Sequence, residues 1–284
     1  MTVTGASDQN PNPLIMRGRQ FVVTISVWVA ALTKPPRVAR SKHAFMVERQ
    51  RLRTGAIAIL LIAVALMGWG LDSAVIKATQ RFPSWIVDTF NEITDYGRSS
   101  WTLWPCGLLV LATAVATTAA ATRMSQRVLA SIAVRLGFVF FAVGVPGLLV
   151  SIGKRWIGRG RPSEAGAFAY HPFSWVPDYA SFPSGHAAAA FSALVAIGAL
   201  FPRARAVLWI YAIVIAMSRI IIAAHYPSDV IVGAMVGAFG AILVREWFAA
   251  RRLGFYVGND GQVHAMPGPS LARIKKVAQA LTAQ

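Results

Sequence analysis

The sequence of 284 residues has few charged residues, and only 11 of them are acidic. Charged residues make up 14% of the chain and hydrophobic residues 56%, whereas roughly a quarter of a soluble domain is charged. This composition excludes an ordinary soluble domain and is typical of an integral membrane protein. The acidic residues form no cluster suited to a metal ion, and no Cys and His pattern has zinc spacing. We therefore expect chemistry without a metal or any other cofactor.

Cysteine is also scarce, since Cys106 is the only one and lies in an apolar run. A single cysteine cannot form an intrachain disulfide, so it gives no information about the redox compartment. The net charge of +17 comes from basic residues that lie between hydrophobic runs rather than along one polar face. Such a distribution favours membrane topology signals over nucleic-acid binding. We expect a bilayer environment and no nucleic-acid partner, while the sequence does not indicate an oligomeric state.

Long apolar segments recur from residue 55 to residue 247 and predict an all-α integral membrane bundle. Six segments are candidates for transmembrane helices, namely residues 55–71, 101–122, 131–153, 186–201, 206–224 and 230–247. Between the first two, residues 72–100 carry aromatic and aliphatic residues at helical spacing among polar ones. This pattern predicts an amphipathic helix on the membrane surface, with a role in packing rather than in catalysis.

The two ends of the chain differ from this domain of residues 55–250. Residues 1–54 form a basic N-terminal extension whose apolar stretch, Phe21–Leu32, is too short to span a membrane. No cleavage pattern follows that stretch, so we expect an interfacial helix or a disordered extension rather than a signal peptide. Residues 251–284 are expected to form a cytoplasmic tail.

The basic residues also predict the orientation in the membrane. With the N-terminus in the cytoplasm, 20 of the 28 Lys and Arg residues lie in cytoplasmic segments, which supports an arrangement with both termini inside. Five of the remaining eight gather in two places on the opposite, periplasmic side of a bacterial inner membrane: Lys154, Arg155, Arg159, Arg161 and Arg219. Cations on the disfavoured side need another reason to be there.

The first polar segment on that side follows the apolar residues 131–153. Lys154 and Arg161 are seven residues apart and would share one face of a continuing helix. Two cations at this spacing could hold a phosphoryl group, although a basic cluster beside a membrane can also bind anionic lipids without specificity.

The second polar segment, Pro183-Ser184-Gly185-His186, opens the predicted span 186–201. Ser184 can cap the helix and Gly185 lets the backbone approach a ligand closely. A helix N-terminus offers unpaired N–H groups to an anion. His186 at this position could protonate a leaving oxygen.

The third polar segment ends the span 206–224 with the pattern Ser218-Arg219-x5-His225-x3-Asp229. Arginine binds phosphate through two parallel hydrogen bonds. A histidine held by a carboxylate has one ring nitrogen fixed as a donor, which leaves the other free to attack or to take a proton. The intervening turn offers Ser228 as a candidate N-cap of the next helix. In the predicted topology all three segments reach the same membrane face.

These three motifs, in this order and at these spacings, resemble the type 2 phosphatidic acid phosphatase superfamily. That superfamily includes lipid phosphate phosphatases and, on soluble scaffolds, vanadium haloperoxidases. The resemblance covers roughly residues 55–250, and no motif residue departs from the pattern. The predicted membrane spans disfavour the soluble haloperoxidases.

The resemblance implies a role for each motif residue. His225 would be the nucleophile that forms a phosphohistidine, and Asp229 would orient it. His186 would protonate the leaving group and then activate water. The phosphoryl oxygens would be held by Lys154, Arg161, Ser184, Gly185 and Arg219. Fixed cations of this kind stabilise a loose phosphoryl transition state without a metal.

We therefore predict a membrane phosphatase that acts on a lipid-linked phosphate or pyrophosphate at the periplasmic face. One alternative is a lipid phosphotransferase, which would pass the phosphoryl group to a lipid or sugar acceptor. Another is a non-enzymatic protein that binds lipid headgroups, which is disfavoured because binding alone needs no pair of His225 and Asp229. The headgroup stays open among polyprenyl pyrophosphate, phosphatidic acid, phosphatidylglycerophosphate and lipid A 1-phosphate.

Overall fold

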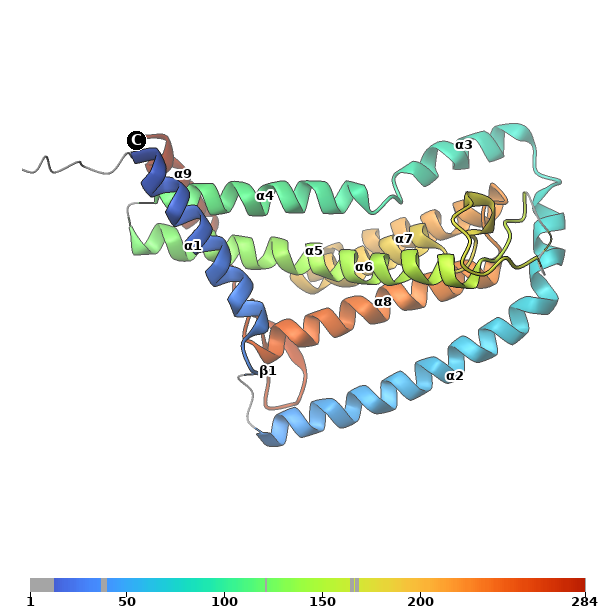
Figure 1. Cartoon of the computed structure of the whole chain (residues 1–284), viewed down its shortest axis with the longest axis horizontal. Helices are drawn as coiled ribbons and strands as arrows, with labels where there is room; N and C mark the ends of the chain where they lie inside the picture. Colours follow the sequence, from blue (N-terminus) through green and yellow to red (C-terminus); the bar gives the residue numbers. More distant parts are fainter. Residues whose placement is uncertain (1–12, 37–39, 121, 164–165, 167–168, 284) are drawn as a thin grey trace, which may run out of the picture.

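The computed structural model describes residues 13–36, 40–120, 122–163, 166 and 169–283, and most of them are helical (Figure 1). Five helices run side by side along the molecule: α4 (Ser100–Ala119), α5 (Arg123–Ile157), α6 (Gly185–Leu200), α7 (Arg205–Ile221) and α8 (Pro227–Ala250). A long helix, α2 (Arg40–Thr79), lies on the other side of α8 and meets its first turn at Asp72. The expected all-α membrane architecture is confirmed in its main features.

Small residues bring α6 and α8 into backbone contact. A Cβ atom on Gly237 would lie 2.1 Å from the carbonyl oxygen of Ala188, and one on Gly233 would lie 2.3 Å from that of Ser184. Only glycine permits such an approach, which is the packing typical of small residues four apart in membrane helices. The start of α6 is therefore held directly against the start of α8.

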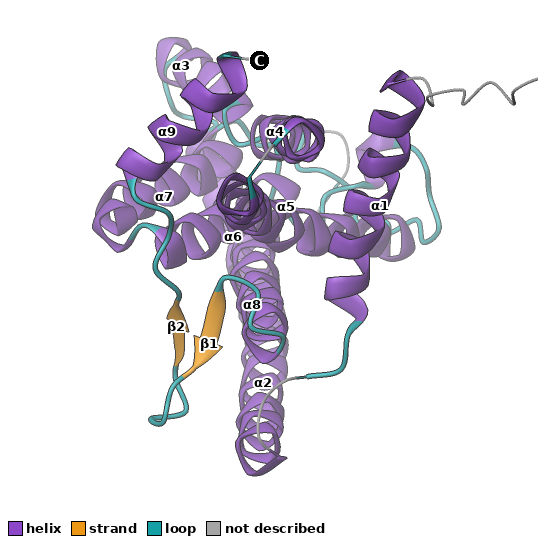
Figure 2. Cartoon of the chain, turned by 90° about the vertical axis from the view of Figure 1, so that its left-hand side faces the viewer, coloured by secondary structure: helices purple, strands orange, loops and turns teal. Residues whose placement is uncertain are grey.

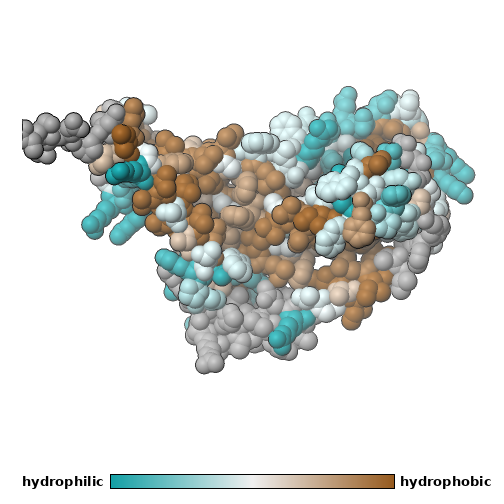
Figure 3. Space-filling view, viewed as in Figure 1, coloured by the Kyte–Doolittle hydropathy of each residue, from teal (hydrophilic) through white to brown (hydrophobic). Residues whose placement is uncertain are grey.

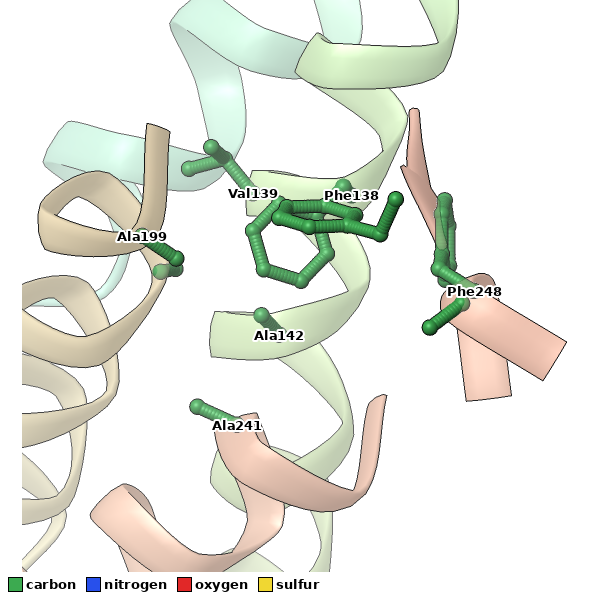
Figure 4. Close-up of a cluster of buried hydrophobic side chains, with 9 residues drawn as sticks. Phe138, Val139, Ala142, Ala199, Ala241 and Phe248 are labelled. Atoms are coloured by element: carbon green, nitrogen blue, oxygen red, sulfur yellow. The ribbon is translucent and has the colours of Figure 1, made fainter. Parts of the chain in front are cut away.

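The main apolar core lies toward the other end of the same helices. It consists of Phe138 and Val139 from α5, small residues of α6 and α8, and Phe248 near the end of α8 (Figure 4). Phe138 packs edge-on against Phe248 and Phe255, with ring centroids 5.5 and 4.6 Å apart. This core fixes the relative positions of the three helices that supply most of the candidate site.

The surface has the pattern expected of a bundle in a bilayer. Apolar residues gather over the middle of the molecule, between more polar ends, on the face shown in Figure 3. Exposed Trp104, Leu108, Leu111 and Val115 follow one another along α4. Such side chains are stable in contact with lipid but not with water.

The number of spans differs from the predicted six. Among the described residues, five helical stretches are long and apolar enough to cross a membrane: Leu14–Thr33, Ser84–Ala119, Arg123–Ile157, Pro202–Ile221 and Pro227–Ala250. The predicted segment 186–201 corresponds to α6, which is apolar but shorter. The predicted segment 55–71 lies within α2, where several side chains are outside the described part. A count of six is therefore not established.

The predicted amphipathic region 72–100 contains three pieces rather than one helix. Residues 72–79 belong to the end of α2, α3 (Ser84–Asp95) follows as a separate helix, and residue 100 begins α4. The amphipathic prediction applies to α3, which packs on α7, where the Tyr211 hydroxyl donates to the Tyr96 carbonyl at 3.0 Å. The last turns of α2 pack one face into the molecule, since Asp72, Ile76 and Thr79 are buried.

The N-terminal extension contains a helix, α1 (Pro13–Thr33). It is longer than the apolar stretch seen in the sequence, and its length and composition suffice to cross a membrane. The expectation that this segment is too short is therefore wrong. Figures 1 and 2 show α1 crossing the bundle helices steeply, at the end away from α3, where it contacts α4. Residues 1–12 and 37–39 of the extension lie outside the described part.

The C-terminal tail, for which no element was predicted, folds against the bundle. It forms an antiparallel hairpin of β1 (Phe255–Val257) and β2 (Val263–Ala265), visible in Figure 2, and the helix α9 (Leu271–Thr282). Arg135 of α5 donates to the carbonyls of Met266 and Pro267 at 2.8 and 3.0 Å. Short 3-10 turns complete the chain at Pro177–Tyr179 and Pro202–Ala204.

Candidate active site

The three polar segments of the sequence meet at one end of the bundle, beside α3 (Figure 1). Lys154 lies in the last turn of α5, Arg219 in the last turn of α7, and Asp229 in the first turn of α8. The first residue of α6 is Gly185, and a Cβ atom there would lie 3.7 Å from the Lys154 Nζ. All eight residues predicted from the motifs belong to this end of the molecule.

His225 lies in the turn between α7 and α8 and is 1% exposed. Its N–H donates to the Arg219 carbonyl at 3.1 Å, and the turn is made by Ala223 in a left-handed conformation, with φ of 52°. Burial lowers the pKa of His225 to about 4, although the nearby Asp229 carboxylate acts in the opposite direction. The imidazole is therefore neutral at neutral pH, as a nucleophile must be.

Asp229 is close to His225 but does not hydrogen-bond to it. The distance from its Oδ2 to the His225 Nδ1 is 3.8 Å, beyond hydrogen-bond range. Instead, Oδ2 accepts hydrogen bonds from the Ser181 hydroxyl and from the Tyr226 N–H, and Oδ1 accepts one from Arg159 Nη1 at 2.6 Å. The predicted orienting role of Asp229 therefore stays a prediction.

Arg159 and Asp72 complete a buried polar network that the sequence motifs did not include. Arg159 Nη2 donates to the Asp72 Oδ2 at 2.8 Å, and its guanidinium lies 4.3 Å from the centroid of the Tyr226 ring. Asp72 also accepts the Ser228 N–H at 3.0 Å and the Ser228 hydroxyl. Ser228 is therefore not the N-cap that the sequence indicated, since Tyr226 occupies that position.

One signal in the sequence could have revealed this network. Asp72 directly follows an apolar run of the kind that spans a membrane, where a carboxylate is costly without a partner. Arg159 is one of the cations on the disfavoured side of the membrane. Asp72 and Arg159 were both predicted at the same face of the membrane, and neither had a partner in its own segment. This combination favours an ion pair between them.

A second group of cations, which we call the open cations, consists of Lys154, Arg161 and Arg219. Within the described part of the chain, the side chains of Lys154 and Arg161 have no hydrogen-bond or ion-pair partner. Arg219 donates from Nη1 to the Thr94 hydroxyl at 2.9 Å. The three charges are close enough to interact with one another. Asp95 and Asp229 lie near enough to act on Arg219 and Lys154, but within the described residues no carboxylate is in ion-pair contact with the open cations. Such an arrangement suits a bound anion.

The N-terminus of α6 adds neutral donors to the open cations. Ser184 occupies the N-cap position, yet its side chain caps nothing, so the predicted capping role is wrong. Its buried Oγ has no hydrogen-bond partner within the described chain, and the same is true of Nε in Arg161 and Arg219. Buried polar atoms are nearly always paired. The oxygens of a phosphoryl group would accept from all of these donors.

His186 lies in the first turn of α6, where the turn between α3 and α4 covers its ring. A Cβ atom on Gly97 would lie 3.2 Å from the His186 Cδ2 and 2.5 Å from the Ile215 Cγ2. Glycine is therefore required at this position, which sequence reasoning did not identify.

Thr94 of α3 was also missed, and its hydroxyl accepts hydrogen bonds from Arg219 and from the Ser218 hydroxyl. The helix assigned to packing thus also positions an open cation.

Comparison with known proteins relates this site to one family. The family model described as the PAP2 superfamily matches residues 135–253. The lipid A 1-phosphatase of Rhizobium johnstonii is 32% identical over 213 residues, which are 74% of this chain and 87% of that protein. Phosphatidylglycerophosphatase B of Escherichia coli is 37% identical over 79 residues, 26% of this chain and 31% of that protein.

A solved structure is also similar. The transmembrane PAP2 type phosphatidylglycerolphosphate phosphatase from Bacillus subtilis superposes with a TM-score of 0.49 and 20% sequence identity. The match covers 68% of this chain and 94% of that chain.

Proposed function

The chain belongs to the PAP2 superfamily, and we propose that it is a membrane phosphatase that hydrolyses the phosphate ester or pyrophosphate of a lipid through a phosphohistidine. The observation that carries this proposal is the position of two histidines beside three cations at the polar end of an apolar bundle. Within the described residues, these cations have no carboxylate partner in ion-pair contact. A lipid phosphate has its charge at the depth where such a bundle end meets the headgroups.

The substrate that we place first is a lipid A-type glycolipid phosphate. The relative that matches along most of its length is named for lipid A 1-phosphate, whereas the match to phosphatidylglycerophosphatase B covers less than a third of that protein. The long match is the stronger guide to a headgroup, because headgroup contacts come from loops as well as from motifs. Polyprenyl pyrophosphate and phosphatidic acid are the comparison substrates.

In the proposed first step, Nε2 of His225 attacks the phosphorus while the bond to the leaving oxygen breaks. The open cations, with the Ser184 hydroxyl and the Gly185 N–H, stabilise the charge on the three equatorial oxygens. His186, whose protonated form is favoured by the negative charge of the bound phosphate, gives a proton to the leaving oxygen. In the second step His186 takes a proton from water, which attacks the phosphohistidine and releases inorganic phosphate. The fixed cations do the work that a metal ion does in other phosphoryl transfers.

The first test is release of inorganic phosphate by the purified protein from a panel of these lipids, in EDTA and without any acceptor. We expect release from the lipid A-type substrate, and no release by His225→Ala. Release that requires an added lipid or sugar acceptor would show a phosphotransferase. Loss of activity in EDTA that Mg²⁺ restores would overturn the proposed mechanism.

The second test concerns the side of the membrane, which we propose to be periplasmic from the charge bias of the loops. In a Cys106→Ala background, Trp175→Cys would place a thiol at a site that is 80% exposed beside the candidate site. Gln279→Cys would place one on the exposed surface of α9. An impermeant thiol reagent should label only the first in intact cells. The opposite labelling would place the site in the cytoplasm.

A further inference from the structure

Asp72 is a buried acid that precedes all three motifs in the sequence. Its side chain nevertheless contacts Arg159 and Ser228, which lie within two of those motifs. It is 0% exposed, comes from α2, and lies outside the residues matched by the family model. Its carboxylate accepts hydrogen bonds from Arg159, from the Ser228 hydroxyl and from the Ser228 N–H. A carboxylate so placed is costly to bury unless these partners are retained.

Arg159 connects the Asp72 carboxylate to Asp229, which lies beside the proposed nucleophile, His225. Its two terminal nitrogens are divided, so that Nη2 donates to Asp72 and Nη1 donates to Asp229 and to the Ser228 hydroxyl. Burial alone would lower the pKa of Arg159, but Asp229 and Asp72 together raise it. The guanidinium therefore stays charged between two carboxylates.

Because the Arg159 guanidinium is shared between two carboxylates, it binds Asp229 through one nitrogen only. An isolated arginine and carboxylate prefer a bidentate pair, in which both nitrogens face both oxygens. Asp72 takes up one nitrogen, so Arg159 holds only the Oδ1 of Asp229. The Oδ2 of Asp229, which accepts hydrogen bonds from the Ser181 hydroxyl and the Tyr226 N–H, is not held by Arg159 and lies 3.8 Å from the His225 Nδ1.

We propose that Asp72 is a positioning residue for the reaction, which acts through Arg159 to keep the Asp229 Oδ2 directed at His225. When the bond between Nε2 and phosphorus forms, positive charge develops on the imidazole and its Nδ1–H needs an acceptor. Without Asp72, Arg159 would turn both nitrogens toward Asp229 and compete for that acceptor. This inference rests on the proposed function of His225 as nucleophile.

The test compares Asp72→Asn with Asp88→Asn, a matched control that removes an exposed acid from α3. Hydrolysis of p-nitrophenyl phosphate and of the lipid substrate is followed, and active sites are counted by trapped phosphoenzyme. We expect Asp72→Asn to lower kcat per active site by about 10–100-fold, the size of coupling found within one polar network. KM and inhibition by inorganic phosphate should change by less than about threefold, because the open cations are untouched.

Two further readouts separate positioning from a role in folding alone. The loss should be equal for the alkyl and the p-nitrophenyl leaving group, since Asp72 acts on the nucleophile and not on the proton donor. In an Asp229→Asn background, Asp72→Asn should cost less than about threefold, because residues that act through one another are not additive.

An unchanged kcat per active site in Asp72→Asn, or a loss that multiplies fully with that of Asp229→Asn, would overturn the inference. If Asp72→Asn yields no folded protein, Asp72→Glu keeps the charge and displaces the carboxylate, and the same kcat loss at unchanged KM is expected. An unmodified protein that releases no phosphate from any substrate would instead refute the proposed function.

Discussion

Two sets of cations at the same end of the bundle differ in what surrounds them. Arg159 is buried between Asp72 and Asp229, whereas the open cations lie close to one another. Within the described part of the chain, only Arg219 among the open cations has a side-chain partner, the neutral Thr94. The residue types are the same, and Arg159 and Arg161 are two positions apart in one loop. The partners therefore decide whether a cation holds the fold together or remains able to bind an anion.

The difference has opposite costs for the free energy of unfolding. Breaking a buried ion pair by removing one partner destabilises a protein by about 3–5 kcal/mol, since an uncompensated charge is left behind. Gathering like charges without a carboxylate costs stability in the absence of a ligand. Functional sites often keep such a destabilising arrangement, because binding of the substrate needs it. The two histidines extend the comparison, since His225 lies between the two sets, near both Asp229 and Arg219, and His186 lies beside the open cations.

The largest effects are expected from these histidines. His225→Ala should abolish both turnover and phosphoenzyme formation with every substrate, because a missing nucleophile is not replaced by a better leaving group. His186→Ala should slow hydrolysis of an alkyl phosphate by about 10²–10⁴-fold, the usual contribution of a positioned acid. That loss should shrink with p-nitrophenyl phosphate, whose leaving group needs less protonation. Steady-state rates and acid-quenched phosphoenzyme measure both effects, and equal rescue of the two variants would reverse the assignment.

The next effect compares Arg161, an open cation, with Arg159, which is paired with two carboxylates. Arg161→Met should lower kcat/KM by about 10²–10³-fold, as loss of one charge-stabilising donor does, with an unchanged or raised thermal midpoint. Arg159→Met should lower the thermal midpoint markedly, because it leaves Asp72 and Asp229 buried without their cation. Thermal unfolding in one detergent, with activity per folded molecule, distinguishes them. Similar stability losses in both variants would show that the two sets are not different in kind.

A smaller effect is expected from pH. The pKa of His225 is lowered to about 4 from a usual value of 6.5, so the unfolded chain binds a proton that the folded chain does not in this window. Stability should therefore fall as pH decreases from about 6.5 toward 4. His225→Ala should show a shallower decline, measured as thermal midpoints across this range. The kcat/KM of the unmodified protein should not decline near pH 6.5 through His225. A decline that His225→Ala leaves unchanged would assign the effect to another group.

The smallest effect concerns inorganic phosphate as a ligand of the open cations. At ten times its dissociation constant, a ligand that binds only the folded state stabilises it by about 1.4 kcal/mol. Phosphate should raise the thermal midpoint of the unmodified protein relative to sulfate-free chloride buffer of equal ionic strength. The rise should disappear in Arg161→Met and persist in Asp88→Asn. A rise of equal size in Arg161→Met would indicate binding elsewhere.

The open cations and the histidines were proposed from the spacing of the motifs, and their roles stay predictions. The helix expected to join Lys154 to Arg161 ends at Ile157, so these two cations do not share one helix face. The sequence also predicted that the motifs meet at one face of the membrane, since that follows from the order of the spans. Asp72 and Arg159 were missed for a physical reason. Their contact joins α2 to the loop after α5 across 87 residues, and no spacing within one segment indicates such a contact.

Elements without a strong pattern were also predicted poorly. Thr94 and Gly97 were hidden within an amphipathic region whose periodicity indicated only packing. The short α6 was counted as a span by its apolar composition, whereas its glycine-dependent contact with α8 is visible only in three dimensions. The hairpin of the tail was also missed, although its loop, Gly258-Asn259-Asp260-Gly261, has the residues typical of a turn. Its strands also pack on α5 and α8.

The ion pair of Asp72 with Arg159 also defines the extent of the catalytic unit. A shortened or transplanted version restricted to residues 135–253 would keep every motif residue. It would also retain the guanidinium of Arg159 and lose the carboxylate that neutralises half of it. The proposed role of Asp72 therefore predicts that the smallest active version of this enzyme includes the end of α2. A fusion or chimera whose junction lies between Asp72 and the start of α4 would need to supply an acid of its own beside Ser228.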